Sequence, residues 1–224
     1  MISLPNWLNR FRKQQAGGGG GVSATKIFQI VANGSAGGCT TSAISTTGST
    51  LFVAALHGYR SPYPQASSSP SNTWTPLTGI GNSGAGAILS YVSSPTTGGS
   101  QTFSADGGDV GTQFSDIGVI GFSGVTTLDG SSAGNAATGN TIQPGSLTPS
   151  VSGEVFVTMV CYDFVTETMS IDSGFTIIGQ GLNSGGTGFA VAYKIKTDAS
   201  AENPTWTATG DANPLLVTVM SAFK

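Results

Sequence analysis

The chain repeats itself after about half its length. TLFVAALHGY (50–59) matches EVFVTMVCYD (154–163), and the offset is 154 − 50 = 104 residues. Shared order and a near-constant offset indicate an internal duplication, whereas similar composition alone would arise between any two Ser/Thr/Gly-rich β segments. The other matching pairs are SNTWTPLTGIGNSGAGAILSYV (71–92) with DSGFTIIGQGLNSGGTGFAVAYKI (172–195), QTFSADG (101–107) with PTWTATG (204–210), and DIGVIGFSG (116–124) with PLLVTVMSAF (214–223).

The hydrophobic residues of each repeat come in short runs bounded by Gly, Pro, Asn and Ser, which is typical of β-strands. Helical periodicity is absent from residue 25 onward. Many short strands without crossover helices predict antiparallel sheets packed face to face. We therefore expect an all-β fold, an antiparallel β-sandwich of jelly-roll type built as one body from two duplicated halves, residues 25–124 and 125–224.

The strands of this sandwich should differ in their surroundings. The runs at 51–56 and 155–160 are apolar on both faces, so we expect central strands there. The segments 87–92 and 101–105 alternate, so they should lie near an edge or face solvent. The expected strands are 50–57, 73–78, 86–92, 101–105, 116–122, 154–162, 174–178, 188–196, 204–208 and 214–222.

The first residues have a different character from the repeats. Apolar side chains recur there at i, i+3, i+4 and i+7, which is one face of a helix, and basic side chains accompany them. We expect residues 1–16 to form an amphipathic basic anchor, helical or extended, and residues 17–24 to form a flexible glycine-rich tether. The residues expected to make the attachment are Leu4, Trp7, Leu8, Arg10, Phe11, Arg12 and Lys13.

Charge and targeting signals narrow the function classes. Charged residues make up only 8% of the chain, and its formal net charge is −3. After residue 26 the balance is acidic, which speaks against nucleic acid as a partner because phosphate binding needs a stripe of Lys and Arg. We find no signal peptide and no run of about 20 apolar residues, so we expect synthesis in the cytoplasm and no membrane span. A membrane surface is the alternative partner of the anchor, but three clustered bases attract anionic lipid only weakly, so a protein partner is preferred.

The sequence contains no recognisable set of catalytic residues. His57 is the sole histidine and is matched by Cys161 in the second repeat, which suits a core residue better than a catalytic base. No GxSxG motif accompanies it, and no aromatic-lined cleft supports a pair of carboxylates. We therefore expect neither an enzyme nor a cofactor. The spacing of Cys39 and Cys161 is not that of metal ligands. Two states remain compatible with the sequence, namely two free thiols or one disulfide.

Two sets of residues are candidates for binding. Asp106, Asp109 and Asp116 place hard oxygen ligands around a Gly-rich loop, a weak calcium candidate that lacks an ordered EF-hand pattern, so a solvated turn is preferred. Tyr59 and Tyr63 lie in a Pro-rich loop and could stack on a glycan, and we expect Tyr63 to be exposed.

Trp74 and Trp206 could also serve a carbohydrate site. Each is matched by a phenylalanine in the other repeat, Phe175 and Phe103 respectively. A position that accepts either ring is usually part of a core. We therefore expect both tryptophans to be core residues.

Residues 25–224 resemble the β-sandwich modules of tailed-bacteriophage virion proteins. The resemblance is carried by SNTWTPL, ILSYVSSP, QTFSAD and IGVIGFSGV followed by LDGSS. It implies a structural protein of the virion surface, either a head fibre, a decoration protein or a tail appendage. Such a protein would attach to other virion proteins through its N-terminus and be present in multiple copies or as a homo-oligomer. The alternative is a carbohydrate-binding or adhesive module that recognises a host cell-surface glycan.

Overall fold

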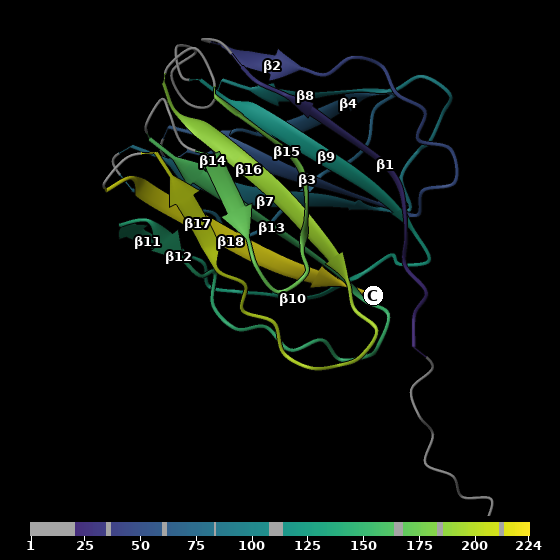
Figure 1. Ribbon diagram of the computed structural model, residues 1–224. Helices are drawn as coiled ribbons and strands as arrows, with labels where there is room; N and C mark the ends of the chain where they lie inside the picture. Colours follow the sequence, from purple (N-terminus) through teal and green to yellow (C-terminus); the bar gives the residue numbers. More distant parts are fainter. Residues whose placement is uncertain are drawn as a thin grey trace, which may run out of the picture.

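The computed structural model describes residues 21–34, 37–59, 62–82, 84–107, 114–163, 168–182, 186–210 and 213–224. Within these ranges all regular structure is β-strand, and every ladder is antiparallel (Figure 1). The prediction of an all-β antiparallel fold is confirmed.

The first half of the chain forms two sheets. The larger sheet has the order β1-β9-β3-β7-β5, and β6 also pairs with β7. The smaller has the order β2-β8-β4. The strands are β1 (Thr25–Ala32), β2 (Gly38–Thr40), β3 (Leu51–Gly58), β4 (Ala66–Ser69), β5 (Thr75–Pro76), β6 (Ile80–Gly81), β7 (Gly86–Ser93), β8 (Thr102–Asp106) and β9 (Asp116–Ser123).

The second half forms two further sheets with corresponding strand orders. The larger runs β10-β18-β13-β16-β15, with β11 also on β18, and the smaller runs β12-β17-β14. Each half thus builds its own pair of sheets. The strands are β10 (Leu128–Ser131), β11 (Asn135–Thr138), β12 (Thr141–Ile142), β13 (Val155–Tyr162), β14 (Thr168–Ile171), β15 (Thr176–Leu182), β16 (Gly188–Ile195), β17 (Trp206–Thr209) and β18 (Leu215–Phe223).

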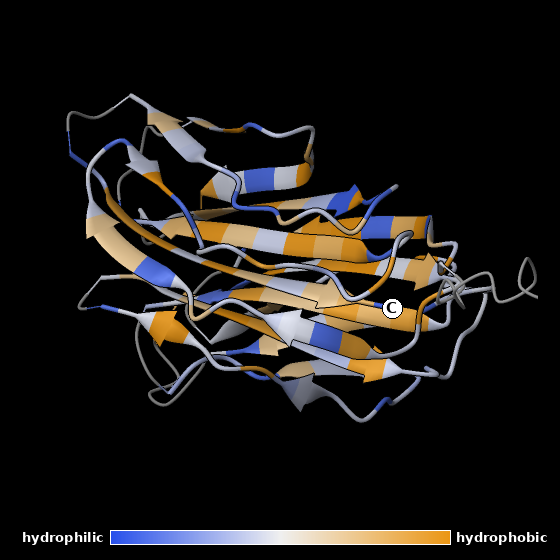
Figure 2. Cartoon of the chain, turned by 90° about the horizontal axis from the view of Figure 1, so that it is seen from below, coloured by the Kyte–Doolittle hydropathy of each residue, from blue (hydrophilic) through white to orange (hydrophobic). Residues whose placement is uncertain are grey.

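The four sheets stack as layers around three hydrophobic clusters. The central cluster lies between the two larger sheets and joins, for example, Val53 of β3 to Val157 of β13. A second cluster lies between β8 and the outer face of the first larger sheet, and a third lies between β17 and the outer face of the second. In Figure 2 the long strands carry most of the hydrophobic colour, while many connections are pale or blue.

The two runs that are apolar on both faces occupy the expected places. β3 lies between β9 and β7, β13 lies between β18 and β16, and every residue of β3 and β13 is buried. The expectation for 101–105 is also met, because β8 buries alternate side chains and exposes the others at least in part. For 87–92 the expectation is met only in part, because β7 lies next to the sheet edge formed by the short β5 and β6 but does not face solvent. β7 is buried along most of its length because one face meets the central cluster and the other faces the smaller sheet.

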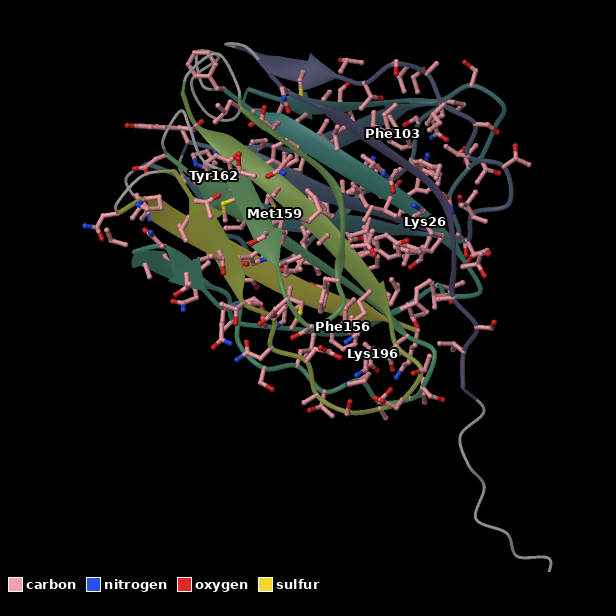
Figure 3. All side chains as sticks on the ribbon, viewed as in Figure 1. Lys26, Phe103, Phe156, Met159, Tyr162 and Lys196 are labelled. Atoms are coloured by element: carbon pink, nitrogen blue, oxygen red, sulfur yellow. The ribbon has the colours of Figure 1, made fainter. Side chains whose placement is uncertain are left out.

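The two ends of the stacked sheets have different roles in the chain path. We call the end where β3 and β13 finish the distal end, and the end where they begin the proximal end. A Cβ added at Gly84, just before β7, would lie 3.0 Å from Asp163 Oδ2, just after β13, so the distal ends of the two halves coincide. Figure 3 shows this direction along β13, from Phe156 beside Lys196 to Tyr162.

Candidate functional site

The N-terminal segment leaves the body at the proximal end. Val22 N donates to Ser152 O at 2.9 Å and Ala24 N donates to Gly153 O at 3.4 Å. Gly153 has φ +85°, and a Cβ there would collide with the carbonyl of Val22, so glycine is required. These contacts fix the exit of the chain beside the C-terminal residue, which Figure 1 marks at the same end.

The predicted anchor lies outside the described residues. This applies to all seven residues expected to make the attachment, Leu4, Trp7, Leu8, Arg10, Phe11, Arg12 and Lys13. The described chain begins at Gly21, within the expected tether.

The distal end of the first half carries the two candidate glycan-contact tyrosines. Tyr59 directly follows β3 and is 42% exposed. Tyr63 precedes β4 and is only half-buried, with its ring so close to Gly79 and Gly86 that a Cβ at either glycine would overlap it. Burial raises the pKa of Tyr63. Tyr63 is thus half-buried and not exposed as expected, and Tyr59 is the more exposed of the two rings.

His57 is held in a buried polar contact just beneath this end. Its Nδ1 lies 2.7 Å from Asp116 Oδ2, and both side chains are fully buried. Asp116 Oδ1 accepts a hydrogen bond from Gly34 N at 2.8 Å. The three residues come from β3, the start of β9 and the chain after β1, so the contact joins three segments of the first half. Because nothing outside can reach the enclosed His57, its position suits a structural role.

The sequence did not identify Asp116 as the partner of His57. Asp116 was instead considered with Asp106 and Asp109 as a calcium candidate. Asp109 lies outside the described residues, Asp106 Oδ1 accepts from Gln65 N at 2.7 Å, and Asp116 points into the core. Among the described residues no group of three or more His, Cys, Asp and Glu side chains could hold a metal ion.

Both cysteines are free thiols. Cys161 belongs to the central cluster, whereas Cys39 packs against the cluster between the sheets of the first half. Burial raises the pKa of Cys161 well above its ordinary value, and burial together with the negative charge of Asp116 raises the pKa of Cys39 to about 11. Neither thiol is therefore suited to act as a nucleophile near neutral pH.

A cluster of charged groups at the proximal end was not predicted. Lys224 Nζ donates to Asp129 Oδ1 at 2.5 Å and to Ser150 Oγ at 2.8 Å. Glu154 is fully buried beside them, and its Oε1 accepts from Val151 N at 2.9 Å. The pairing that brings β10 beside the end of β18 creates the cluster, and no local motif signals it.

The two tryptophans of the body belong to cores, as predicted. Trp206 is fully buried in the cluster beneath β17, and its Nε1 donates to Thr158 Oγ1 at 3.2 Å. Trp74 is half-buried and packs against Phe52 and Phe103. Neither ring is available as an open platform for a sugar.

Comparison of the chain with models of protein families, with curated proteins and with solved structures gave no match. Within the described ranges there is no helix with the length and apolar character needed to cross a membrane. The function therefore has to be inferred from the sequence and the geometry of this chain.

Proposed function

We propose that the protein is a structural component of a virion surface, attached through its N-terminus, that displays its β body outward. The supporting observation is the chain path. Residues 22–24 leave at the proximal end, while β3 and β13 end, and β9 and β18 begin, at the distal end. An attachment at residues 1–16 would therefore point the distal end away from the particle.

The charge distribution fits this proposal. Arg10, Arg12 and Lys13 lie in the predicted anchor, whereas the described lysines of the second half are engaged within the body. Lys194 and Lys196 both contact Glu202 Oε1 at 2.6 Å. Three of the eight basic residues of the chain thus stand close together in the predicted anchor, where they would meet acidic groups around an apolar groove.

We further propose that the body is a duplicated jelly roll. The chain crosses repeatedly between the larger and the smaller sheet within each half, as in jelly rolls, although β5 to β7 and β15 to β16 stay in the larger sheet. The ladders correspond in register, since Leu51 pairs with Phe122 in one half and Val155 pairs with Phe223 in the other. The isolated bridges Ile44↔Gln101 and Leu147↔Glu202 correspond as well. Two similar modules in one chain give a broad, rigid body behind a single attachment point.

The test of the attachment is to change Trp7 and Phe11 together to Ser and to measure incorporation into particles and binding to anionic liposomes. The matched control changes Asn6 and Asn9 to Ser, which removes polar side chains on the helix face opposite the apolar stripe. We expect the Trp7/Phe11 variant to lose incorporation while the control retains it. Undiminished incorporation of the Trp7/Phe11 variant would refute the anchor, and loss of liposome binding alone would assign the segment to a membrane.

A second candidate function is recognition of a cell-surface glycan at the distal end. The exposed ring of Tyr59 and the half-buried ring of Tyr63 favour it, because tyrosine presents an apolar face and a polar tip. The test is a glycan array probed with the full chain and with Tyr59→Ala and Tyr63→Ala, each compared with its Phe variant. Stacking predicts a loss of about tenfold or more on Ala substitution, about 1.4 kcal/mol, and retention with Phe. No glycan binding by the full chain would discard this candidate.

A further inference from the structure

Two carboxyl groups at the proximal end compete for one ammonium group. Asp129 of β10 has an 8% exposed side chain and binds Lys224 Nζ and Ser150 Oγ, the latter at 2.6 Å. Glu154, just before β13, is fully buried and also reaches Ser150 Oγ, at 3.3 Å. Because both carboxyl groups contact the same hydroxyl oxygen, they lie next to each other.

The nearby Lys196 does not pair its ammonium group with the carboxyl group of Glu154. Lys196 approaches Glu154 through its backbone, with N donating to Glu154 O at 2.8 Å. Its ammonium group is committed elsewhere, to Glu202 at 2.6 Å and to Asp198 at 3.0 Å. In the described part of the chain, Glu154 Oε2 is enclosed and finds no donor. An ionised Glu154 would therefore be a buried charge beside a second negative charge, which is costly.

We propose that Asp129 and Glu154 share one proton, which Glu154 Oε2 donates to Asp129, and that its loss loosens the contact between residues 22–24 and residues 152–153. The proton supplies the donor that Oε2 lacks. It also leaves one net negative charge for the single ammonium group of Lys224.

The charge environment of the two acids supports the shared proton. Burial raises the pKa of Glu154, and the negative charge of Asp129 adds to this effect. For Asp129, burial also acts to raise the pKa, but hydrogen bonds from Lys224 and Ser150 outweigh it and lower the pKa to about 2. The environment thus separates the two pKa values, as expected when one proton serves two carboxyl groups.

The shared proton lies where the N-terminal segment joins the body. Glu154 directly follows Ser152 and Gly153, whose carbonyls accept from Val22 N and Ala24 N, and Gly153 N donates to Lys196 O at 2.9 Å. Repulsion between ionised Asp129 and ionised Glu154 would displace the turn at residues 152–153. Because the folded pKa of Glu154 lies above the ordinary 4.5, its contribution to stability is present below pH 4.5 and is lost as pH rises through the folded value.

The direct test is a titration of the Glu154 side-chain carboxyl by carbon NMR in the full chain. We expect a midpoint above 4.5 and a lower midpoint in Asp129→Asn, which removes the neighbouring charge and frees Lys224. In the wild type, the amide protection factors of Val22 and Ala24 should fall as Glu154 ionises. A midpoint at or below 4.5 would overturn the shared proton, and unchanged protection factors through the titration would overturn the link to the N-terminal contact.

Substitution gives an independent readout. Glu154→Gln keeps the shape and an N–H donor toward Asp129 but cannot ionise. Between the pKa of Glu154 in the unfolded chain and its higher pKa in the folded protein, the equilibrium constant for unfolding of the wild type should rise by up to about tenfold per pH unit. Glu154→Gln should lack this dependence. The matched control is Glu202→Gln, a buried glutamate paired with two lysines at the same end, which should keep the wild-type dependence in this range. Equal slopes for the wild type and Glu154→Gln would refute the proposal.

Discussion

The contact between His57 and Asp116 offers a sharp test of how the first half is held together. In His57→Ala, the fully buried Asp116 loses a partner at 2.7 Å. Breaking a buried pair by removing one partner costs about 3 to 5 kcal/mol. Domains of this kind are stable by about 5 to 15 kcal/mol, so the loss should be obvious in urea unfolding followed by tryptophan fluorescence.

The second half shows how the same place is filled without charge. His57 pairs with Asp116 across β3 and β9, and Cys161 pairs with Val217 at the corresponding place across β13 and β18. The double variant His57→Cys, Asp116→Val copies that arrangement. It leaves Gly34 N without its carboxylate acceptor, so we expect a cost of about 1 to 3 kcal/mol, below that of His57→Ala.

The single variants His57→Cys and Asp116→Val complete the cycle. Asp116→Val should cost more than the double variant because His57 Nδ1 also loses its partner. The reasoning would be refuted by His57→Ala within about 1 kcal/mol of the wild type, or by a double-variant cost equal to the sum of its two single substitutions.

Two further predictions follow from the cores. Trp206→Ala should destabilise the protein by about 3 to 5 kcal/mol, because Trp206 is fully buried. Trp74→Ala should cost clearly less, because Trp74 is half-buried. Equal shifts of the urea unfolding midpoint in the two variants would contradict this expectation. Under non-reducing native conditions at pH 8, Cys161 should resist iodoacetamide and Cys39 should react slowly, since a pKa of about 11 leaves about one thiolate in a thousand. Mass spectrometry after denaturation should then find both thiols labelled, and a disulfide-linked peptide would contradict the structure.

Much of the fold follows from hydrophobic pattern. The β3 and β13 segments are long apolar runs, and a strand buried on both faces needs such a run. The expected strands also omitted β1, an eight-residue strand whose apolar residues Ile27, Phe28, Ile30 and Val31 do carry a strand signal. Most of the other strands that the pattern did not reveal are short and polar. β4 reads ASSS and pairs with β8 through its backbone, so its side chains carry no hydrophobic signal.

The burial of β7 shows a different limit. Residues 87–92 alternate in part, which normally indicates one solvated face. In this fold a second, smaller sheet covers the outer face, and Ile88 and Val92 pack there with Phe103. A covering layer depends on the whole topology, so a local window cannot predict it.

The same limit applies to the polar contacts. His57 was recognised as a core residue, but its partner Asp116 is 59 residues away in the chain. Asp129 and Lys224 are 95 residues apart, and only the pairing of β10 with β18 brings them together. Spacing along the sequence carries no information about contacts of this range.

The most direct test of the proposed attachment is co-sedimentation with particles, using the full chain and residues 22–224 side by side. Circular dichroism must first show that both are β-rich and melt cooperatively, which we expect because the described sheets begin at Thr25. Attachment through the N-terminus predicts that the full chain sediments with particles and that residues 22–224 stay in solution. Equal binding of the two chains, with both folded, would contradict the proposal.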